Sequence, residues 1–468
     1  MDRPEAEKIY ASGKEATILA LLELAAENKA LLTNNAQLLQ RLDQLEANGS
    51  AKPSPSTPSG MIPPYEKPSA SNRRRKQPGR KKGHPGTRRS PIPEEAITGT
   101  ETHQLNVCPH CHGPVSLLAE TRERFTEDIP VQQPELTRHI QQVGWCTTCK
   151  KKVVAVVTTA LPGATIGNRA LVLSSWLHYG LGTTVSHITQ VFGAHFHFPL
   201  TPGGLIQMWL RLAQILYPWY LQIIEQARLS AYLHADETGW RVNGVTHWLW
   251  CFCNTKLTCY LIHRCRGSPV LAELVGELFS GILISDFWSA YDKLEAAARQ
   301  VCFVHLFREL EKVAKLNQNP EWLAFQKKLA RFLRDALRLD KNHSLSEPER
   351  VNRLLRLHQR LDDLLAASYQ DPHCKRLVGR LQKHREHILT FLETDIPAHN
   401  NHSERQIRPA VIIRKNSYGN RSLQGAEVQA VLMSIYRTLK LRGHDPLETI
   451  TAALKHYVLN RQLPPLPA

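Results

Sequence analysis

Three runs rich in β-branched, aromatic and other apolar residues alternate with turns in LSAYLHADETGWRVNGVTHWLWCFCNTKLTCYLIH, residues 229–263. The turns fall at Asn243-Gly244 and at residues 254–256. Asn-Gly between such runs is a strong signal for a β-hairpin. We therefore expect an antiparallel meander of three strands, the first of which ends at Asp236.

The residues that follow complete the pattern of an α/β domain. SPVLAELVGELFS, residues 268–280, has the spacing of an amphipathic helix, and GILIS, residues 281–285, is a continuous apolar run typical of a buried strand. This order of three strands, a helix and a strand is that of the ribonuclease-H-like fold. Asp236 and Asp286 then lie at the tips of buried strands, where a carboxylate is rigidly held yet reaches solvent. That placement suits two Mg²⁺ (or Mn²⁺) ions.

A third carboxylate would complete such a metal site, and Glu404 is the candidate. It lies in IPAHNNHSERQIRPAVIIRKNSYGNRS, residues 396–422, after a strongly charged and mostly helical block at 310–395 that we interpret as an insertion. An acid among bases is also typical of a salt-bridged helix residue. The two preceding aspartates favour the catalytic interpretation. In that interpretation four nearby basic side chains hold the DNA backbone: Arg405, Arg408, Arg414 and Lys415.

Charge points to a polyanionic partner. The 468 residues hold 59 Lys and Arg against 42 Asp and Glu, a net charge of +17, which favours a polyanionic partner over a merely basic soluble protein. Nucleic acid is the commonest such partner, and double-stranded DNA is the one that we predict. Residues 71–90 carry nine Lys or Arg and no acid among Gly and Pro, which predicts a flexible arm that neutralises phosphates. Its DNA-binding candidates are Arg73, Arg74, Arg75, Lys76, Arg80, Lys81 and Lys82.

Composition also excludes several classes of protein. With 42% hydrophobic and 22% charged residues and no long apolar stretch, the chain is not expected to be a membrane protein or disordered. Ten cysteines in this length are too few for a disulfide scaffold, which favours a reducing cytoplasm over secretion.

Two Cys-x-x-Cys pairs, Cys108/Cys111 and Cys146/Cys149, are separated by 34 residues. Each pair can place two thiolates on one metal ion, and two such knuckles complete a tetrahedral site. We therefore predict one structural zinc ion in a zinc-ribbon-like module, with chance or redox pairs as the alternative.

Residues 14–47 predict a single helix with leucines seven residues apart, which favours a dimeric coiled coil over a helix packed on its own protein. These leucines are Leu24, Leu31, Leu38 and Leu45.

Residues 168–225 look helical, with a helix start near Thr201-Pro202. That pattern suits a helix-turn-helix, although any small helical bundle reads similarly.

These patterns divide the chain into eight segments. They are a coiled coil (1–49), a Pro/Ser linker and basic arm (50–100), a zinc module (101–160), a helical region (161–228), a first core part (229–309), a helical insertion (310–395), a second core part (396–445), and a C-terminal helix with its tail (446–468).

The motifs HADETGW, ISDFWSAYD, CFVHLFRE and HNNHSERQIRPAVIIRKNSYGN resemble the insertion-sequence transposases of the sixty-six group, which are bacterial DDE transposases. The resemblance covers most of residues 14–445. It implies that Asp236, Asp286 and Glu404 are the catalytic acids. It also matches Cys302 and His305 to a Cys-x-x-His pair, for which core packing and support of the active site weigh about equally. Departures from the family pattern are Gly239, Arg308-Glu309 and His399, and none removes a catalytic carboxylate.

We therefore expect a DDE transposase that cleaves and joins DNA at the ends of an insertion sequence in the bacterial cytoplasm, associated with the nucleoid. It would act as a homodimer or larger oligomer through the coiled coil, and the resemblance suggests small accessory proteins. Two alternatives remain: a transposase-derived DNA-binding protein without catalysis, and a structure-specific nuclease of the same fold.

Overall fold

The computed structural model describes residues 9–22, 24–26, 28–29, 31–33, 90 and 92–468. The chain divides into two compact units, residues 1–82 and 83–468. In the first unit, the described residues between 14 and 33 are helical, and the side chain of Leu31 on that helix is exposed. Leu38, Leu45 and the basic residues at 73–82 lie outside the described residues.

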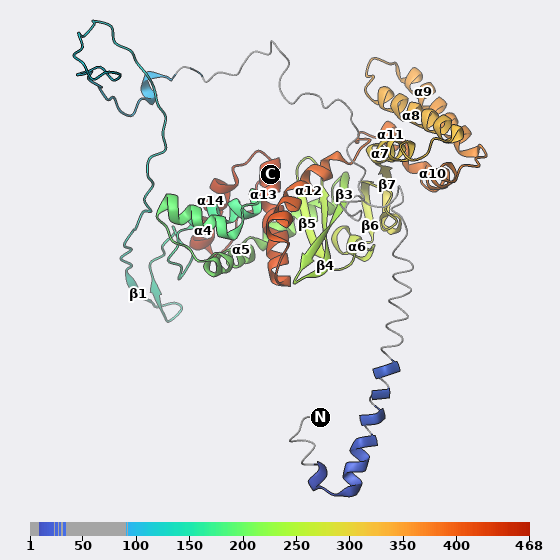
Figure 1. Cartoon of the computed structure of the whole chain (residues 1–468), viewed down its shortest axis with the longest axis horizontal. Helices are drawn as coiled ribbons and strands as arrows, with labels where there is room; N and C mark the ends of the chain where they lie inside the picture. The colour runs from blue at the N-terminus through green and yellow to red at the C-terminus, as the bar shows by residue number, and fades with distance from the viewer. Residues whose placement is uncertain (1–8, 23, 27, 30, 34–89, 91) are drawn as a thin grey trace. The chain divides into compact units, whose positions relative to one another are not determined.

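A five-stranded sheet forms the centre of the second unit (Figure 1). The inner strand β3 pairs antiparallel with β4, which pairs antiparallel with β5, whereas β6 and β7 run parallel to β3. In spatial order the strands are β5 (Thr258–His263), β4 (Val245–Cys253), β3 (Tyr232–Val242), β6 (Leu278–Ser285) and β7 (Glu295–Val301). This sheet with its many helices is compatible with the ribonuclease-H-like core that the sequence predicts.

The first strand of the meander is longer than the sequence predicts. β3 pairs with β4 without interruption as far as Val242 and Val245, and the turn follows at Asn243-Gly244. Both turn residues have positive φ, 48° and 75°, as a type I′ hairpin requires. The prediction that the strand ends at Asp236 is therefore wrong, because the ladder continues through the polar residues and leaves Asp236 inside the strand.

The helix before β6 is shorter than the sequence predicts. α6 covers Pro269–Val275, and Gly276, at φ 87°, ends it. Residues 278–280, which we expected to be helical, instead begin β6. In residues 278–285, alternate side chains are buried at the start of the strand and successive side chains at its end. This burial in the sheet outweighs the preference for a helix that the spacing of the apolar residues indicated. Asp286 follows directly after β6, as expected.

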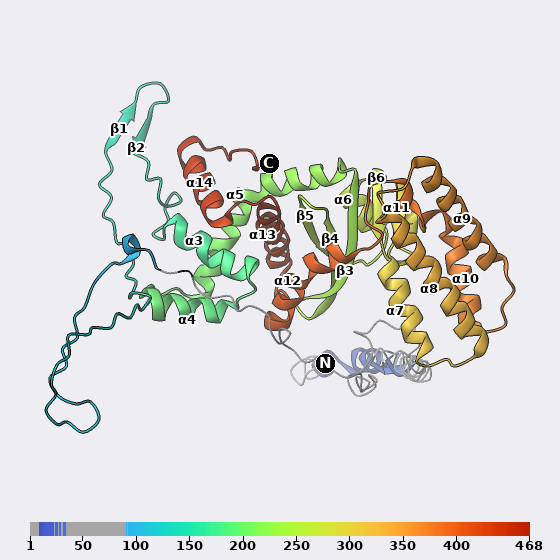
Figure 2. The same ribbon diagram turned by 90° about the horizontal axis from the view of Figure 1, so that it is seen from above.

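Helices from before and after the strands in the sequence share one hydrophobic core with the sheet. α13 packs against β5 and α5, and α12 packs against β3 and β4 (Figure 2). Thr201 caps α5 and Pro202 begins it, as the sequence predicts. The helices of this part are α3 (Asn168–Ser175), α4 (Val185–Phe196), α5 (Pro202–Arg228), α12 (Asn401–Ser417), α13 (Leu423–Leu441) and α14 (Pro446–Asn460).

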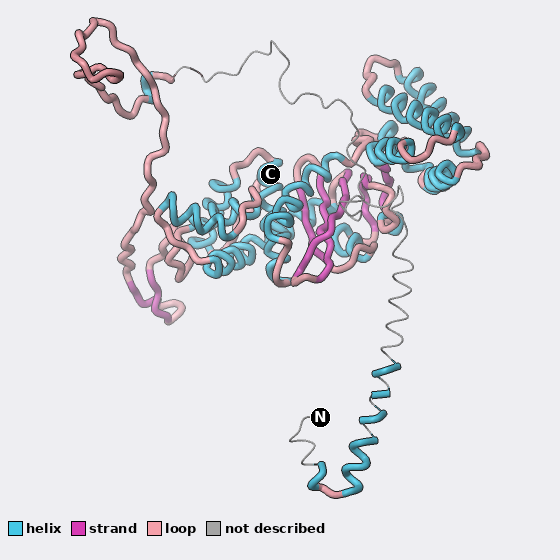
Figure 3. The backbone as a smooth tube through the Cα atoms, in the orientation of Figure 1, coloured by secondary structure: helices cyan, strands magenta, loops and turns pink. Residues whose placement is uncertain are grey.

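The block that we interpret as an insertion is helical (Figures 2 and 3), and together with residues of β6 and β7 it builds a second hydrophobic core. Its amphipathic helices pack mainly on one another, and α11 also packs on the edge strand β7. They are α8 (Pro320–Asp340), α9 (Glu347–Ala366), α10 (Pro372–Lys383) and α11 (Thr390–Glu393). α7 (Phe303–Ala314) begins before the block, within the first core part, and packs on α8. Among the helices that the structure describes, none combines the length and apolar character needed to cross a membrane.

Candidate active site

Asp236 and Asp286 are brought together by the pairing of the two central parallel strands. β3 and β6 pair in the register Tyr232↔Ile282 and His234↔Ile284. Asp236 and Asp286 each lie two residues beyond the last pair of this register, and their carboxylates are close enough for their charges to interact. The pairing stops just before the two acids, because β6 ends at Ser285. The carboxylates therefore lie at the point where the strands separate.

Mutual repulsion of acids marks this site. Burial, with the neighbouring Glu237 and Asp286 carboxylates, raises the pKa of Asp236 to about 8. One Asp236 oxygen accepts a hydrogen bond from the backbone N–H of Glu237 at 2.9 Å, and one Asp286 oxygen accepts one from the N–H of Trp288 at 2.9 Å. Buried acids whose charged forms repel one another are stabilised by a bound cation.

Glu404 lies in the first turn of α12 and is held by α7. Arg308 donates two hydrogen bonds to its two carboxylate oxygens, at 2.6 and 3.0 Å, and this pairing lowers the pKa of Glu404. The ring of His305, one turn earlier on α7, lies 3.8 Å from Glu404. The third predicted acid is thus present at the site, but its charge is paired with Arg308.

His305 lies among all three acids. Burial by itself lowers the pKa of His305, but the Cys302 thiol and the Asp286 and Asp236 carboxylates outweigh it and raise that pKa to about 9. Its contact with Glu404 completes the set. The raised pKa favours the protonated form of His305 at neutral pH, and the Nδ1 of its ring is buried with no hydrogen-bond partner within the described residues.

Asn400 joins the start of α12 to the sheet. Its side chain donates to the backbone oxygen of Ala235 at 2.7 Å and lies 3.0 Å from the Nδ1 of His234. Its backbone N–H lies 3.1 Å from the Cys302 sulfur, so the buried thiol helps to position Glu404, four residues further along α12. The Nδ1 of His399 is buried and has no hydrogen-bond partner within the described residues.

Glu237 is a functional candidate that the sequence analysis missed. Its side chain is 3% exposed, and Arg266 donates two hydrogen bonds to its Oε1, at 2.8 and 3.1 Å. The Tyr291 hydroxyl donates to its Oε2 at 2.6 Å. The available signal was a second acid directly after Asp236, but the partners of Glu237 lie 29 and 54 residues away in sequence.

Arg266 is itself enclosed by aromatic rings. Its guanidinium carbon lies 4.3 Å from the ring centre of Trp248 and 4.1 Å from that of Trp288, which are distances of cation–π contacts. Since Trp288 also donates its backbone N–H to Asp286, this cluster connects the loop after β6 to β3. The cluster therefore holds the two aspartates in a defined relative position.

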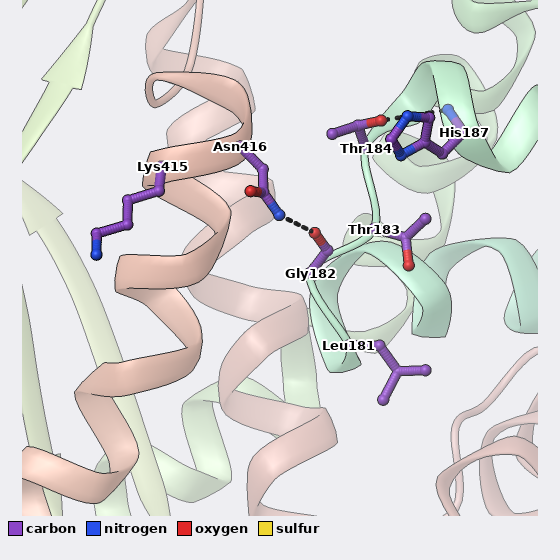
Figure 4. Close-up of a pocket in the computed structure, with 7 residues that line it drawn as sticks. All are labelled: Leu181, Gly182, Thr183, Thr184, His187, Lys415 and Asn416. Carbon is purple, nitrogen blue, oxygen red and sulfur yellow. Dashed lines mark hydrogen bonds between the residues drawn. The ribbon is translucent and has the colours of Figure 1, made fainter.

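The basic side chains of α12 that we predict to bind DNA have different environments. Arg405 and Arg408 are exposed beside Glu404. Arg414 donates hydrogen bonds to the Thr238 hydroxyl and to the Gly239 backbone oxygen, and so it ties α12 to β3. Lys415 is exposed and lines a pocket at the start of α4, where Asn416 donates to the Gly182 oxygen at 3.0 Å (Figure 4).

The donor set fits a hard cation. Magnesium prefers carboxylate oxygens, and Asp236 and Asp286 present two of them side by side. In the part of the chain that the structure describes, no three His, Cys, Asp or Glu side chains are grouped closely enough to hold a metal ion. Glu404, the third predicted ligand, is engaged by Arg308.

The four zinc candidates form two separate pairs. Cys146 ends β1 (Val143–Cys146), which pairs antiparallel with β2 (Lys151–Val154), and its sulfur lies 3.1 Å from that of Cys149. Hydrogen bonds from backbone N–H groups lower the pKa of Cys146 and that of Cys108, as suits a metal-binding thiolate. All four thiols are free, and residues 115–142 between the pairs form no helix or strand.

This combination of a mixed α/β sheet with acids at its centre is compatible with a nucleic-acid-processing domain of the ribonuclease-H-like class. A family model described as Transposase IS66 family matches residues 163–428, more than half of the chain, and this chain belongs to that family. Membership implies DNA transposition in general, and such transposases generally use divalent metal ions such as Mg²⁺. No curated protein matches the chain significantly.

Both titrating groups of the site are expected to make the metal-free protein less stable as pH rises. Asp236 keeps a proton in the folded state that the unfolded chain releases near pH 3.8. The contribution of Asp236 to the free energy of unfolding therefore declines as pH rises from about 3.8 to about 8. The contribution of His305, complete below about pH 6.5, is lost as pH rises through about 9. In EDTA, the melting temperature should therefore fall as pH rises from about 6 to about 8.5.

Mg²⁺ should reduce this fall, because it favours the ionised form of Asp236. Differential scanning fluorimetry of wild type and Asp236→Asn, with EDTA or with Mg²⁺, measures the effect. An Asp236→Asn variant with the same pH dependence as wild type would contradict the role given to Asp236.

Proposed function

We propose that this protein is a DNA transposase that cleaves DNA strands at the ends of an insertion sequence and transfers them to a target. The observation that carries this proposal is the proximity of Asp236 and Asp286, which lie two residues beyond the last residues that pair β3 with β6. Membership of the transposase family supports DNA as the substrate. Asp236, Asp286 and Glu404 are the proposed catalytic acids.

Asp236 and Asp286 would hold the divalent cation, Mg²⁺ or Mn²⁺, and Glu404 would be the third ligand in place of its contact with Arg308. Two such ions, when bound, activate a water or 3′ hydroxyl and stabilise the leaving oxygen in displacement at phosphorus. His305 balances the charge of the acids from the α7 side. Arg405 and Arg408, exposed on α12 beside Glu404, would bind the phosphates that flank the reacting one.

The assay that tests this proposal follows the joining of a labelled oligonucleotide, which carries the presumed element end, to supercoiled plasmid. We expect purified wild-type protein to nick and to join in Mg²⁺ or Mn²⁺ and to do neither in EDTA. Nicking without joined products would indicate the structure-specific nuclease. Tight DNA binding without either reaction, across several end sequences, would indicate a binding protein without catalysis.

The N-terminal segments are proposed to serve the same reaction. The helix within residues 14–33 exposes the apolar side chain of Leu31, which a second helix could cover. We propose that this helix pairs two protomers, so that two element ends are held together. Sedimentation of a Leu24→Lys, Leu31→Lys double variant should show monomers where wild type shows dimers. Unchanged dimers would place the interface elsewhere.

We also propose that Cys108, Cys111, Cys146 and Cys149 bind one structural zinc ion. The expected result is one zinc per chain by atomic emission, with loss of that zinc when Cys146 and Cys149 are replaced by Ser. Prolonged chelation should make residues 101–155 much more sensitive to limited proteolysis, because a structural zinc supplies folding free energy directly. A region that stays resistant to protease after its zinc is removed would contradict a structural role.

A further inference from the structure

The outer face of α8 carries a straight row of cations that no site described above uses. Its members recur every three or four residues, lie within about 60° of one another around the helix axis, and are all exposed. The buried residues of α8, such as Phe325 and Leu329, lie on the opposite face. The row, called here the α8 basic row, consists of Lys327, Arg331, Arg334 and Arg338.

The row is far from neutralised by nearby acids. Asp335 is 3.9 Å from Arg331 and 3.0 Å from Arg338, but the same carboxylate also lies 3.0 Å from Arg360 of α9. The single carboxylate of Asp335 thus forms ion pairs with three guanidinium groups. Lys327 and Arg334 make no ion pair within the described part of the chain.

The neighbouring helix α9 extends the positive surface. α8 and α9 pack side by side (Figure 2), and Arg353 and Arg356 are exposed on α9 in the same spacing as Arg360. Two acids flank these arginines, and each has a partner on its own helix: Glu349 accepts from Ser346, and Asp363 accepts from Gln359. The seven cations therefore outnumber the three acids around them.

The dimensions of the row fit duplex DNA. The eleven residue-to-residue steps from Lys327 to Arg338 rise about 16 Å along the helix, which exceeds the roughly 12 Å width of the major groove of B-DNA. Cations at the two ends of the row can therefore reach phosphates on both strands that border the groove. Arginine and lysine side chains of this kind bind phosphate oxygens without reading bases.

The row is also attached to the element that holds the site. α8 packs against α7, and α7 carries His305 and Arg308, which contact Glu404. DNA held along α8 would therefore be held by the same helical body that contacts the third acid.

We propose that the α8 basic row, with the arginines of α9, binds the phosphate backbone of double-stranded DNA. This is a second DNA contact, separate from the cations of α12, and its biological meaning rests on the proposed transposase function. Binding through it is independent of sequence, because only phosphates are contacted.

The test compares two full-length variants that lose the same charge. The row variant replaces its four cations: Lys327→Gln, Arg331→Gln, Arg334→Gln and Arg338→Gln. The control variant replaces four exposed cations on the β4–β5 turn, α13, α14 and the residue after α14: Lys256→Gln, Lys440→Gln, Lys455→Gln and Arg461→Gln. Fluorescence anisotropy with a labelled duplex of random sequence measures affinity from 50 to 300 mM salt (about the range in which phosphate contacts dominate).

For the row variant we expect the slope of log affinity against log salt to become shallower by about 2 to 4, since each lost phosphate contact contributes about 0.9. Affinity at the lowest salt should fall by about tenfold or more, equally for unrelated duplexes. The control variant should bind within about twofold of wild type. A variant with Arg331→Lys, Arg334→Lys and Arg338→Lys keeps the charge and should retain most of the affinity.

Row and control variants with the same slope and affinity would overturn the proposal. Because all four row side chains are exposed, circular dichroism should be unchanged, and a folding defect in the row variant is detected separately. Failure of the transposase function is distinguishable from failure of this inference: in the first case wild type neither nicks nor joins DNA, whereas in the second wild type binds DNA and the row variant matches the control.

Discussion

Replacement of Asp286 by Asn should abolish metal-dependent nicking and joining while leaving the fold intact. Asn has the size of Asp, and its amide oxygen can still accept the hydrogen bond from the Trp288 N–H, so the loop after β6 keeps its structure. What is lost is the negative charge that a divalent cation requires beside Asp236. Loss of a metal ligand removes several kcal/mol of transition-state stabilisation, and we expect a decrease on the order of 10³-fold or more.

The measurement uses wild type, Asp286→Asn and the matched control Asp395→Asn, an exposed aspartate outside the site. Nicking and joining of plasmid are assayed in Mn²⁺ and Mg²⁺, and Mn²⁺ binding is measured by electron paramagnetic resonance. Asp286→Asn should bind Mn²⁺ much more weakly than the other two proteins, at an unchanged melting temperature. Equal activity in wild type and Asp286→Asn would assign the reaction to another site or to a contaminant.

Removal of the Arg266 side chain should destabilise the domain more than any other single change at the site. Glu237 is buried, and Arg266→Ala leaves its carboxylate with only the Tyr291 hydroxyl as a side-chain partner. Breaking a buried ion pair on one side typically costs about 3–5 kcal/mol. Arg266 is a quarter exposed, so we expect the lower end of that range, to which the lost cation–π contacts with two tryptophans add.

The double variant Arg266→Met, Glu237→Gln separates charge from packing. It removes both charges, and the amide oxygen of the introduced glutamine can still accept the hydrogen bond from Tyr291, so most of the lost stability should return. Urea unfolding followed by tryptophan fluorescence reports the difference, because Trp248 and Trp288 contact Arg266 directly. If the double variant unfolds as easily as Arg266→Ala, the buried carboxylate is not the cause.

The fold was predictable where local signals and tertiary pairing agree. Asn243-Gly244 forms the expected turn, Thr201-Pro202 begins the expected helix, and Asp286 follows the expected buried strand. The two errors, at the end of β3 and at the end of α6, come from polar or helix-spaced residues that the sheet nevertheless incorporates. Ladder hydrogen bonds and burial against neighbouring strands outweigh the local preferences there.

The candidate site was predictable to the same degree. Asp236 lies within β3 and Asp286 directly after β6, and the sequence itself marks both strands, so their proximity could be expected once the two strands were taken as neighbours. Glu237 was missed because a carboxylate inside a strand gives no sign of its partners, Arg266 and Tyr291, which come from a loop and a turn further along the chain.

The sequence alone therefore determined the acids, the order of the strands that carry two of them, and the excess of positive charge, because residue type and periodicity are local properties. Only the tertiary structure decided that Asp236 and Asp286 lie just beyond the last residues that pair β3 with β6, that Arg308 and His305 meet Glu404, and that the cations of α8 form one outward row. These facts depend on strand register and on helix packing between residues up to 99 positions apart in the sequence, where contacts form only after the core is assembled.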